Sequence, residues 1–288
     1  MSKRCWDLNR LFKESAKWAF SIVSIILVFV PNAVFAAIVT IPNWAIQFLP
    51  VDNNAEDEIR AASSKLLFLL IAFIIAFFAQ INRKSVKIKG NNYIIEVKYG
   101  DLFKEKKCKK VINFDECYTS HVGANPSDIK ATSICGQYLQ TKGEDFDIQR
   151  LIDNSEVKPE KTTSKFKGMP GYKPGTIIAN EDALLLAFAT LNENGRAKFY
   201  TRDEFIECLS RMWEQIELNC SQTDVCVPIL GSGLTLFEGC GDSSPSQQDL
   251  LNIMIWSYKL SSHKVKAPFK LRIVCQKRDG FSLNKVDA

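Results

Sequence analysis

The sequence is poor in the residues that build metal centres and hydrolytic triads. Its 288 residues include only two histidines, His121 and His263, and its nine cysteines contain no Cys-x-x-Cys pair. Because structural zinc sites use such closely spaced pairs, we expect no bound metal. Two histidines also give no Ser-His-Asp or Cys-His arrangement that could be proposed, so we name no catalytic residue.

A large charge of one sign is also missing. The formal net charge is only +5, and much of the excess lies beside two long apolar stretches in the first 82 residues. A basic face for nucleic acid is therefore not expected. The cysteines are scattered and odd in number, and several lie in apolar runs. This pattern favours reduced core residues and a reducing cytosol around the soluble part.

The two apolar stretches are expected to cross a membrane. Trp18 to Ile41 contains no charged residue, and its 24 residues can span a hydrocarbon core of about 30 Å. Pro31-Asn32 is expected to kink this span. Leu66 to Ile81 is a second uncharged run, and the span can extend back across Lys65, which can snorkel, to residue 61. The alternative for the first stretch is a signal peptide cleaved after Val34-Phe35-Ala36. The alternative for the second stretch is a buried helix of a soluble protein. We predict spans at about 18–41 and 61–81, within an N-terminal part that ends at residue 84.

The charges beside these spans predict their orientation. Basic residues precede the first span and follow the second, and the short loop between them carries more acidic residues. By the positive-inside tendency, both chain ends lie in the cytoplasm. No charged residue lies in mid-span, so an ion relay of the transporter kind has no candidate. Two spans cannot enclose a pore, so any conducting structure requires a homo-oligomer.

Residues 85–288 read as one cytosolic α/β domain. Strands alternate with helices, which predicts a layered α/β architecture. Tyr118 to Ser133 reads as a loop, and residues 155–170 read as an exposed, mobile insertion. The basic stretch from Lys104 to Lys110 is expected to be a solvated or membrane-facing loop, with phosphate binding as the alternative. The expected strands cover residues 86–89, 93–99, 111–114, 174–179, 184–191, 224–230 and 270–275, and the expected helices begin near 133, 146, 201 and 246.

One strand ends in a way that predicts a ligand site. The apolar run Asp224 to Leu230 reads as a buried strand and is followed directly by Gly231-Ser232-Gly233. At the carboxyl end of a strand in an open α/β sheet, such a loop is where ligands usually bind. Its backbone N–H groups suit a phosphate or diphosphate. A plain tight turn is the alternative.

The order of the motifs resembles the macro domain family. Gly100-Asp101-Leu102 follows a strand, Asn113 lies in the next one, and Ser133 to Gln137, Pro174-Gly175-Thr176 and Leu230 to Leu234 follow in the family's order. With the two spans, the chain is most similar to the macro domain of the membrane-anchored Thoeris anti-phage effector. The resemblance covers about residues 86–276. It implies a three-layer α/β/α domain with a mixed sheet that binds ADP-ribose.

The resemblance also implies the site residues. Asp101 corresponds to the acidic residue that holds the adenine amino group, with a turn carboxylate as the alternative. Gly136 takes the place of the first phosphate loop, and Leu230 to Leu234 that of the second. The implied ligand-binding residues are Asp101, Leu102, Asn113, Asp115, Glu116, Ser133, Cys135, Gly136, Gln137, Pro174, Gly175, Thr176, Leu230, Gly231, Ser232, Gly233 and Leu234.

Two departures from the family pattern bear on activity. Phe114, Asp115 and Glu116 stand where the family has Ala, Ala and Asn, and the triple-glycine loop is missing. Macro-domain hydrolases rely on both features, so a non-enzymatic sensor is favoured. Asp115 and Glu116 are expected to place negative charge near one end of the site, which suits a cationic or hydrogen-bonding group beyond ADP-ribose.

The leading hypothesis is a membrane effector of bacterial anti-phage defence in the inner membrane. In the resembled system, a partner enzyme with a Toll/interleukin-1 receptor (TIR) domain consumes NAD and makes a histidine–ADP-ribose conjugate. That conjugate is the expected ligand here, with no separate cofactor. The expected partners are membrane lipid, the TIR-domain enzyme and further copies of the chain, but no nucleic acid. Binding would trigger assembly, membrane disruption and cell death. A membrane-tethered ADP-ribosyl hydrolase and a protein-docking module are the alternatives.

Overall fold

A computed structural model of the chain separates two compact units, residues 6–83 and the residues from 84 onward. Each unit has its own packing and is described by itself. The structure describes residues 8–38, 53–125, 127–143, 145–161, 163–164, 166–199, 201–233, 235–238, 245–277 and 280–286.

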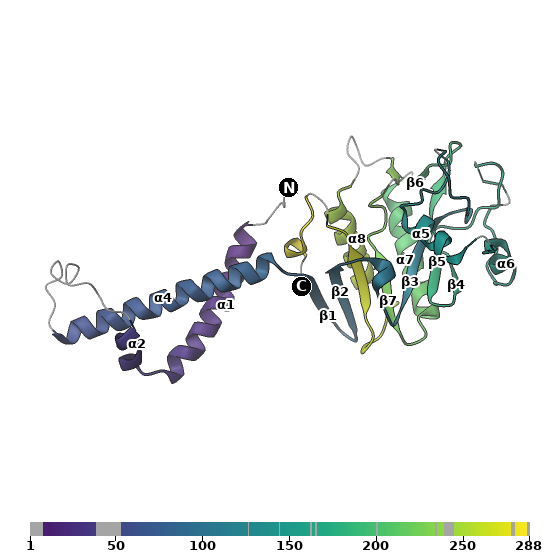
Figure 1. Ribbon diagram of the computed structural model, residues 1–288. Coiled ribbons are helices and arrows are strands. Elements are labelled where there is room, and N and C mark those ends of the chain that lie inside the picture. The colour runs from purple at the N-terminus through teal and green to yellow at the C-terminus, as the bar shows by residue number, and fades with distance from the viewer. Residues whose placement is uncertain are drawn as a thin grey trace. The chain divides into compact units, whose positions relative to one another are not determined.

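The first unit is helical. It contains α1 (Leu8–Phe29), α2 (Asn32–Ile38) and α4 (Asn53–Ile81) (Figure 1). Within α4, Glu58–Ile81 is long and apolar enough to cross a membrane, with a mean hydropathy of 2.3. The chain bends by 113° between α1 and α2, so this pair counts as a span only if both helices form one broken crossing. The expected kink at Pro31 is therefore a full break, because proline removes a backbone donor. Residues 39–41 of the expected span lie outside the described ranges.

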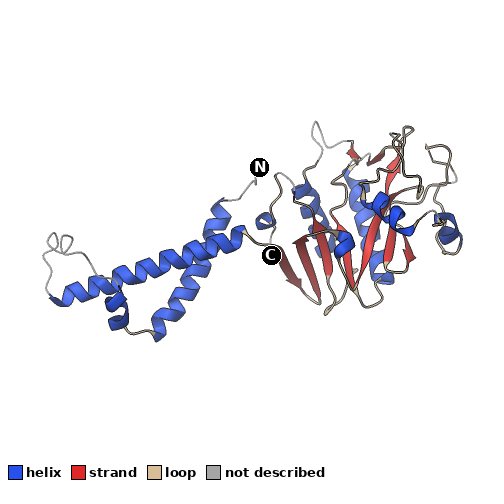
Figure 2. Ribbon diagram, viewed as in Figure 1, coloured by secondary structure: helices blue, strands red, loops and turns tan. Residues whose placement is uncertain are grey.

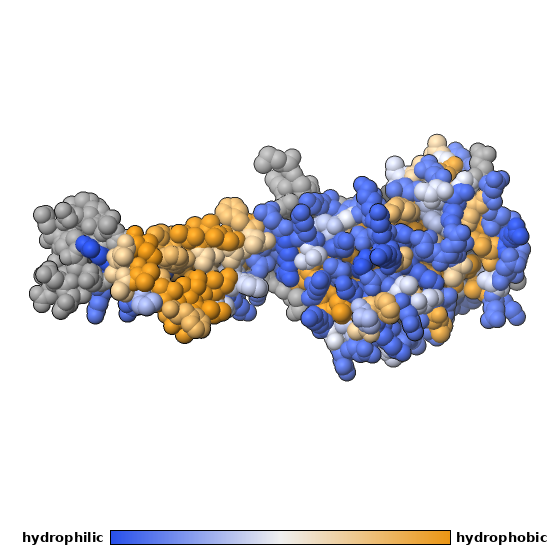
Figure 3. Space-filling view, turned by 60° about the horizontal axis from the view of Figure 1, so that its bottom comes forward, coloured by the Kyte–Doolittle hydropathy of each residue, from blue (hydrophilic) through white to orange (hydrophobic). Residues whose placement is uncertain are grey.

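Small residues line the contact between these helices. Ala19, Ala61 and Ser64 are buried, and Ser64 Oγ donates a hydrogen bond of 2.6 Å to the carbonyl of Phe35. Small side chains and hydroxyl donors are what hold helices together in lipid. Leu11, Val23 and Phe35 are buried with them, while many other large apolar side chains point outward, and Phe12 is 60% exposed. Figure 3 shows this surface as a continuous hydrophobic area. Apolar surface of this extent marks a membrane or protein contact.

The second unit is built on a mixed sheet. Its strands lie in the order β1-β2-β9-β7-β3-β5-β6-β8, with β4 beside β5. From β2 to β5 along this order all neighbouring strands are parallel. β1 runs antiparallel to β2, β4 and β6 run antiparallel to β5, and β8 is parallel to β6. The strands are β1 (Ser85–Gly90), β2 (Tyr93–Tyr99), β3 (Cys108–Asp115), β4 (Ile177–Asn180), β5 (Ala183–Leu191), β6 (Ala197–Phe199), β7 (Asp224–Pro228), β8 (Leu236–Phe237) and β9 (Leu271–Cys275).

Helices cover both faces of this sheet (Figure 2). α7 (Arg202–Asn219) and α8 (Gln247–Leu260) pack on one face, and α5 (Ile134–Lys142) and α6 (Ile148–Asp153) pack on the other. Successive strand residues face opposite layers, so Val111 lies in one core cluster and Ile112 in the other. The expected α/β domain with helices on both faces of a mixed sheet is confirmed.

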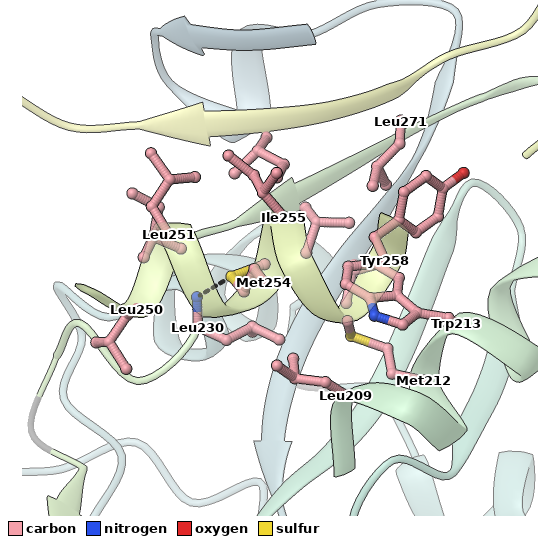
Figure 4. Packing of buried hydrophobic residues seen from close by; sticks show 14 of the residues in the cluster. Leu209, Met212, Trp213, Leu230, Leu250, Leu251, Met254, Ile255, Tyr258 and Leu271 are labelled. Atoms are coloured by element: carbon pink, nitrogen blue, oxygen red, sulfur yellow. Dashed lines mark hydrogen bonds between the residues drawn. The ribbon is translucent and has the colours of Figure 1, made fainter. Parts of the chain in front are cut away.

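The layer made by α7 and α8 is the larger core. Met254 and Tyr258 of α8 pack against Met212 and Trp213 of α7 (Figure 4). The Trp213 indole donates to Ser257 Oγ at 3.0 Å. Each helix begins at a capping box, formed by Thr201 with Glu204 and by Ser246 with Asp249. The expected helix starts near residues 201 and 246 are confirmed.

One expectation about a loop was wrong. Residues 155–170 are not simply an exposed insertion, because Ser164 and Phe166 are buried and Phe166 packs with Cys117 and Leu191. The sequence analysis made no prediction for the chain after β9, and Phe281 and other residues of this segment are buried in the larger core. In both segments a few apolar residues in polar surroundings meet a surface formed by distant strands.

Candidate functional site

The sheet contains one topological switch point, between β3 and β7. After β3 the chain passes through α5 and α6 on one face and continues to β4 and β5. After β7 it passes through α8 on the other face and returns to β9. The β3–β7 ladder joins only Cys108–Lys110 to Asp224–Cys226, while β3 continues beside β5 to Asp115. Ligands of open α/β sheets bind outside the strand ends at such a point.

The loop that follows β7 lies at this switch point. It contains Gly231, whose backbone conformation requires a glycine. Gly231 has a φ of +77°, a region that side-chain-bearing residues rarely adopt. A Cβ at this position would lie 2.8 Å from Cζ of Phe237. Just before it, Leu230 is buried and its N–H donates to Met254 Sδ at 3.4 Å (Figure 4). Packing therefore fixes where the loop leaves the sheet.

Backbone donors are free in this loop. Ser232 Oγ donates to the carbonyl of Ile229 at 2.8 Å and tightens the turn. Within the described ranges, the N–H groups of Gly231 and Gly233 have no hydrogen-bond acceptor. A Cβ on Gly233 would meet nothing within 4 Å. Free amides in an open glycine turn suit an anion. Leu234, which was also expected here, lies outside the described residues.

Asn113 offers a polar atom on the other side of the switch point. It pairs with Leu186 of β5, three residues beyond the end of the β3–β7 ladder. Its Oδ1 is buried and has no hydrogen-bond partner in the described part of the chain. An unpaired buried acceptor costs about 1–3 kcal/mol. A ligand O–H or N–H would satisfy it.

Asp101 lies at the end of β2, on the same edge of the sheet. Gly100 N–H donates to the Cys275 carbonyl at 3.1 Å, which holds the turn against β9. Asp101 Oδ1 accepts from Phe103 N–H at 3.0 Å and caps η1 (Leu102–Lys104). The side chain stays 46% exposed, so it can also accept from a ligand. Leu102 is buried beneath the turn.

The carboxylates of Asp115 and Glu116 are bonded inside the protein. Asp115 accepts from Cys117 N–H at 2.8 Å and from the Thr119 hydroxyl. Glu116 is 3% exposed and accepts from Leu191 N–H at 3.0 Å. The tight loop after β3 has N–H groups that need acceptors, and these carboxylates supply them. The expected contact with a cationic part of the ligand therefore has no geometric support.

Burial raises the pKa of the Asp115 carboxyl above its ordinary value of 3.8, although its hydrogen bonds lower it. A raised folded pKa means that the free energy of unfolding falls as the pH rises from about 3.8 through that pKa. Asp115→Asn does not titrate and can keep the bond from Cys117. We subtract the free energy of unfolding of the wild type from that of Asp115→Asn, both measured by urea unfolding. We expect this difference to increase as the pH rises over this interval. A difference that decreases with pH would show that the hydrogen bonds outweigh burial.

Ser133 to Gln137 forms the N-terminal cap and first turn of α5. Ser133 Oγ accepts from Gly136 N–H at 3.0 Å as the helix cap. Gly136 is buried, and a Cβ there would lie 2.3 Å from the Lys130 carbonyl. Cys135 is also buried, and the Gln137 amide donates to the Thr132 carbonyl. The glycine is needed for close packing of the first helical turn.

Pro174-Gly175-Thr176 lies beside β5, away from the switch point. Gly175 has a φ of +98°, and its N–H donates to the Ala187 carbonyl at 2.7 Å. A Cβ there would lie 2.6 Å from the Cys208 carbonyl of α7. The Thr176 carbonyl accepts from the Tyr118 hydroxyl. Asp101 follows β2, Asn113 lies in β3 and residues 230–233 follow β7, within the strand order β2-β9-β7-β3, whereas this turn lies beyond β3, next to β5.

The C-terminal segment was missed by the sequence analysis. Leu283 N–H donates to the Tyr99 hydroxyl at 3.3 Å, and Phe281 packs edge-on against the Tyr99 ring. Ser282 N–H donates to Gln248 Oε1 at 3.3 Å. This segment therefore ties the start of α8 to the end of β2, two residues before Asp101. The apolar residues at 281, 283 and 286 were the only signal in the sequence.

Residues 95–276, more than half of the chain, match the family described as "Thoeris protein ThsA, Macro domain". The chain belongs to this Thoeris ThsA macro-domain family. The expected membership of the macro domain family is thereby confirmed. Among curated proteins, the chain is similar to "Thoeris protein ThsA" of Bacillus amyloliquefaciens (strain Y2). The two are 26% identical over 290 residues, which cover 97% of this chain and 91% of that one.

Solved macrodomain structures from Oceanobacillus iheyensis are also similar. The structure of that macrodomain with ADP has a TM-score of 0.37 at 14% identity, covering 67% of this chain and 88% of that one. The structure with MES bound has a TM-score of 0.37 at 13% identity, covering 67% and 89%. The family match, rather than these likenesses, supports the assignment to the Thoeris ThsA macro-domain family.

Proposed function

We propose that this chain is a membrane effector of anti-phage defence whose macro domain senses an ADP-ribose-derived nucleotide. The observation that carries the proposal is the loop after β7, where Gly231 and Gly233 present free N–H groups at the switch point. A diphosphate would lie against these groups. Asn113 Oδ1 would accept from a ribose hydroxyl, and Asp101 would accept from the adenine amino group.

The residues that follow the helical unit, Lys84 and Ser85, are bonded to β2, which ends two residues before Asp101. Tyr99 N–H donates to the Lys84 carbonyl at 3.1 Å, and Ser85 pairs with Lys98. A ligand that shifts the turn at Asp101 can thereby act on the segment that follows α4. It changes the population of an assembled state only through its different affinity for the two states. The proposed result is homo-oligomerisation and membrane disruption, from an inner-membrane site with both chain ends cytoplasmic.

The proposed ligand is histidine–ADP-ribose, made from NAD by a TIR-domain partner. The support for the ADP-ribose part is the arrangement of Asp101, Asn113 and Gly231. The histidine part rests on the resemblance to the Thoeris effector, because Asp115 and Glu116 are bonded elsewhere.

A titration of the full chain in nanodiscs with ADP-ribose, histidine–ADP-ribose and NAD tests the proposal. We expect heat of binding for at least the first two ligands, with the conjugate binding more tightly. Absence of binding for all three would end the sensor proposal.

An ADP-ribosyl hydrolase is the second candidate. Its support is the macro domain itself and the position of Asn113. Against it, burial raises the pKa of the Cys117 thiol to about 11 and that of Cys135 well above its ordinary value, so neither is a thiolate near neutral pH. His263 is hydrogen-bonded to Glu217 of α7, with 2.8 Å between Nδ1 and Oε2, on the face that α7 and α8 cover. Release of ADP-ribose from a modified protein, lost in Asn113→Ala, would favour the hydrolase.

The role of Asp101 gives a prediction about base selectivity. Asp101→Ala removes the acceptor for an exocyclic amine and should lower the affinity for ADP-ribose, which contains adenine, by about tenfold. Inosine diphosphate ribose has no such amine, so its affinity should stay within about threefold of wild type. Calorimetry with both ligands measures the difference. Equal losses for the two ligands would assign Asp101 to capping the turn alone.

A further inference from the structure

At its β1 edge, the sheet carries lysines on the face opposite α7 and α8. Val86 and Ile88 of β1 are buried in the layer of α7 and α8, so Lys87 and Lys89 point from the opposite face. On that face α5 contacts β3 and α6 contacts β4. We call the lysine surface the exposed set Lys84, Lys87, Lys89, Lys104, Lys106 and Lys107.

A short segment places the second group of lysines on the same face. Lys87 pairs with Glu96, and Glu96 pairs with Arg272, so these side chains share that face. Glu105 lies above them, with Oε1 2.8 Å from Lys98 Nζ and Oε2 3.4 Å from Arg272 Nη1. Lys104 and Lys106 flank Glu105 in the chain. Both are exposed to solvent, and so is Lys107.

The acidic groups on this face are already neutralised within the protein. Glu96, Glu105 and Asp224 all pair with Arg272, and their side chains are at most 16% exposed. Lys104 Nζ lies 3.9 Å from Asp101 Oδ2. The other members of the lysine surface form no ion pair with any residue in the described ranges. The charge that this face presents to solvent is therefore positive.

The lysine surface follows the membrane-spanning candidate closely in the chain. β1 begins four residues after α4 ends at Ile81. The three residues between them reach at most about 10 Å, which is close to a Debye length at physiological salt. Tethering at this distance keeps the lysines at high effective concentration near a lipid surface. Anionic headgroups attract lysines placed in this way.

We propose that the lysine surface binds the phosphate groups of anionic lipids in the membrane that holds the helical unit. The inference rests on the membrane part of the proposed function, and it adds the lipid class and the residues that contact it. Binding is electrostatic, so it weakens as salt screens the charges.

Amine acetylation of the full chain in nanodiscs, read by mass spectrometry, tests this. One preparation contains phosphatidylcholine alone and the other also contains phosphatidylglycerol. We expect Lys87, Lys89, Lys106 and Lys107 to react several-fold more slowly with phosphatidylglycerol present, and the effect to disappear near 1 M salt, where the Debye length is about 3 Å. The exposed Lys158 and Lys167 should react equally in both preparations.

A matched pair of variants locates the effect. Lys106→Glu with Lys107→Glu should abolish the protection of Lys87 and Lys89. Lys158→Glu with Lys167→Glu changes the net charge equally and should leave that protection intact. Equal reaction rates in the two nanodiscs would overturn the proposal, as would protection by added RNA but not by phosphatidylglycerol.

Ligand titration of the same nanodiscs separates the two proposals. Protected lysines without nucleotide binding would leave the lipid surface standing and end the sensor proposal. Nucleotide binding without protected lysines would leave the sensor proposal standing and end the lipid-surface proposal. A chain that does not remain with the nanodiscs would contradict the membrane anchor on which both depend.

Discussion

Gly231→Ala should reduce the affinity for ADP-ribose by at least about tenfold. Its backbone φ of +77° costs a side-chain-bearing residue about 1–3 kcal/mol. The new methyl group would also lie 2.8 Å from the Phe237 ring, so the loop must move. A displaced loop no longer presents its N–H groups to the diphosphate. Calorimetry measures the affinity, and urea unfolding measures the stability that is lost with it.

Gly143→Ala is the matched control for backbone strain. Gly143 has a similar φ of +81° at the end of α5, and a Cβ there would meet nothing within 4 Å. Its ψ of −177° places it in a region that essentially only glycine adopts, so this variant should lose about 1–3 kcal/mol of stability and keep wild-type affinity. Similar affinities for Gly231→Ala and Gly143→Ala would show that the loop after β7 is an ordinary turn.

Asn113→Ala should weaken ligand binding by about tenfold, because a hydrogen bond from the ligand to Oδ1 is lost. The stability of the unliganded protein should change little, because the variant also removes a buried acceptor that has no partner among the described residues. Calorimetry and urea unfolding of the same preparation measure both quantities.

Asn180→Ala should show the opposite pattern. The Asn180 amide donates to the Tyr138 hydroxyl at 2.8 Å at the end of β4, away from the switch point. Its loss should cost about 1 kcal/mol of stability with no change in affinity. If Asn113→Ala instead lowers stability and leaves affinity unchanged, Asn113 is a structural residue.

Features encoded by neighbouring residues could be predicted from the sequence. The Thr201 capping box lies within four residues, and the apolar run before Gly231 ends at the glycine itself. The alternation in β1 and β2 predicted their hairpin in the same way. In each case the physical cause and its effect lie within one turn or one strand.

Features that depend on distant partners could not be predicted. The acceptor role of Glu116 depends on Leu191, 75 residues away, so its carboxylate seemed free to meet a ligand. Gly136 was assigned to a phosphate loop from the family resemblance, and the Lys130 backbone against which it packs is not apparent in the sequence. The same holds for Tyr99 and the C-terminal segment, which meet across 184 residues.

A structure of the chain with bound ADP-ribose tests the central claim most directly. The account predicts diphosphate oxygens about 2.7–3.2 Å from the N–H nitrogens of Gly231 and Gly233, with Asn113 Oδ1 on a ribose hydroxyl. A nucleotide bound elsewhere on the domain, with the loop after β7 unchanged, would contradict it.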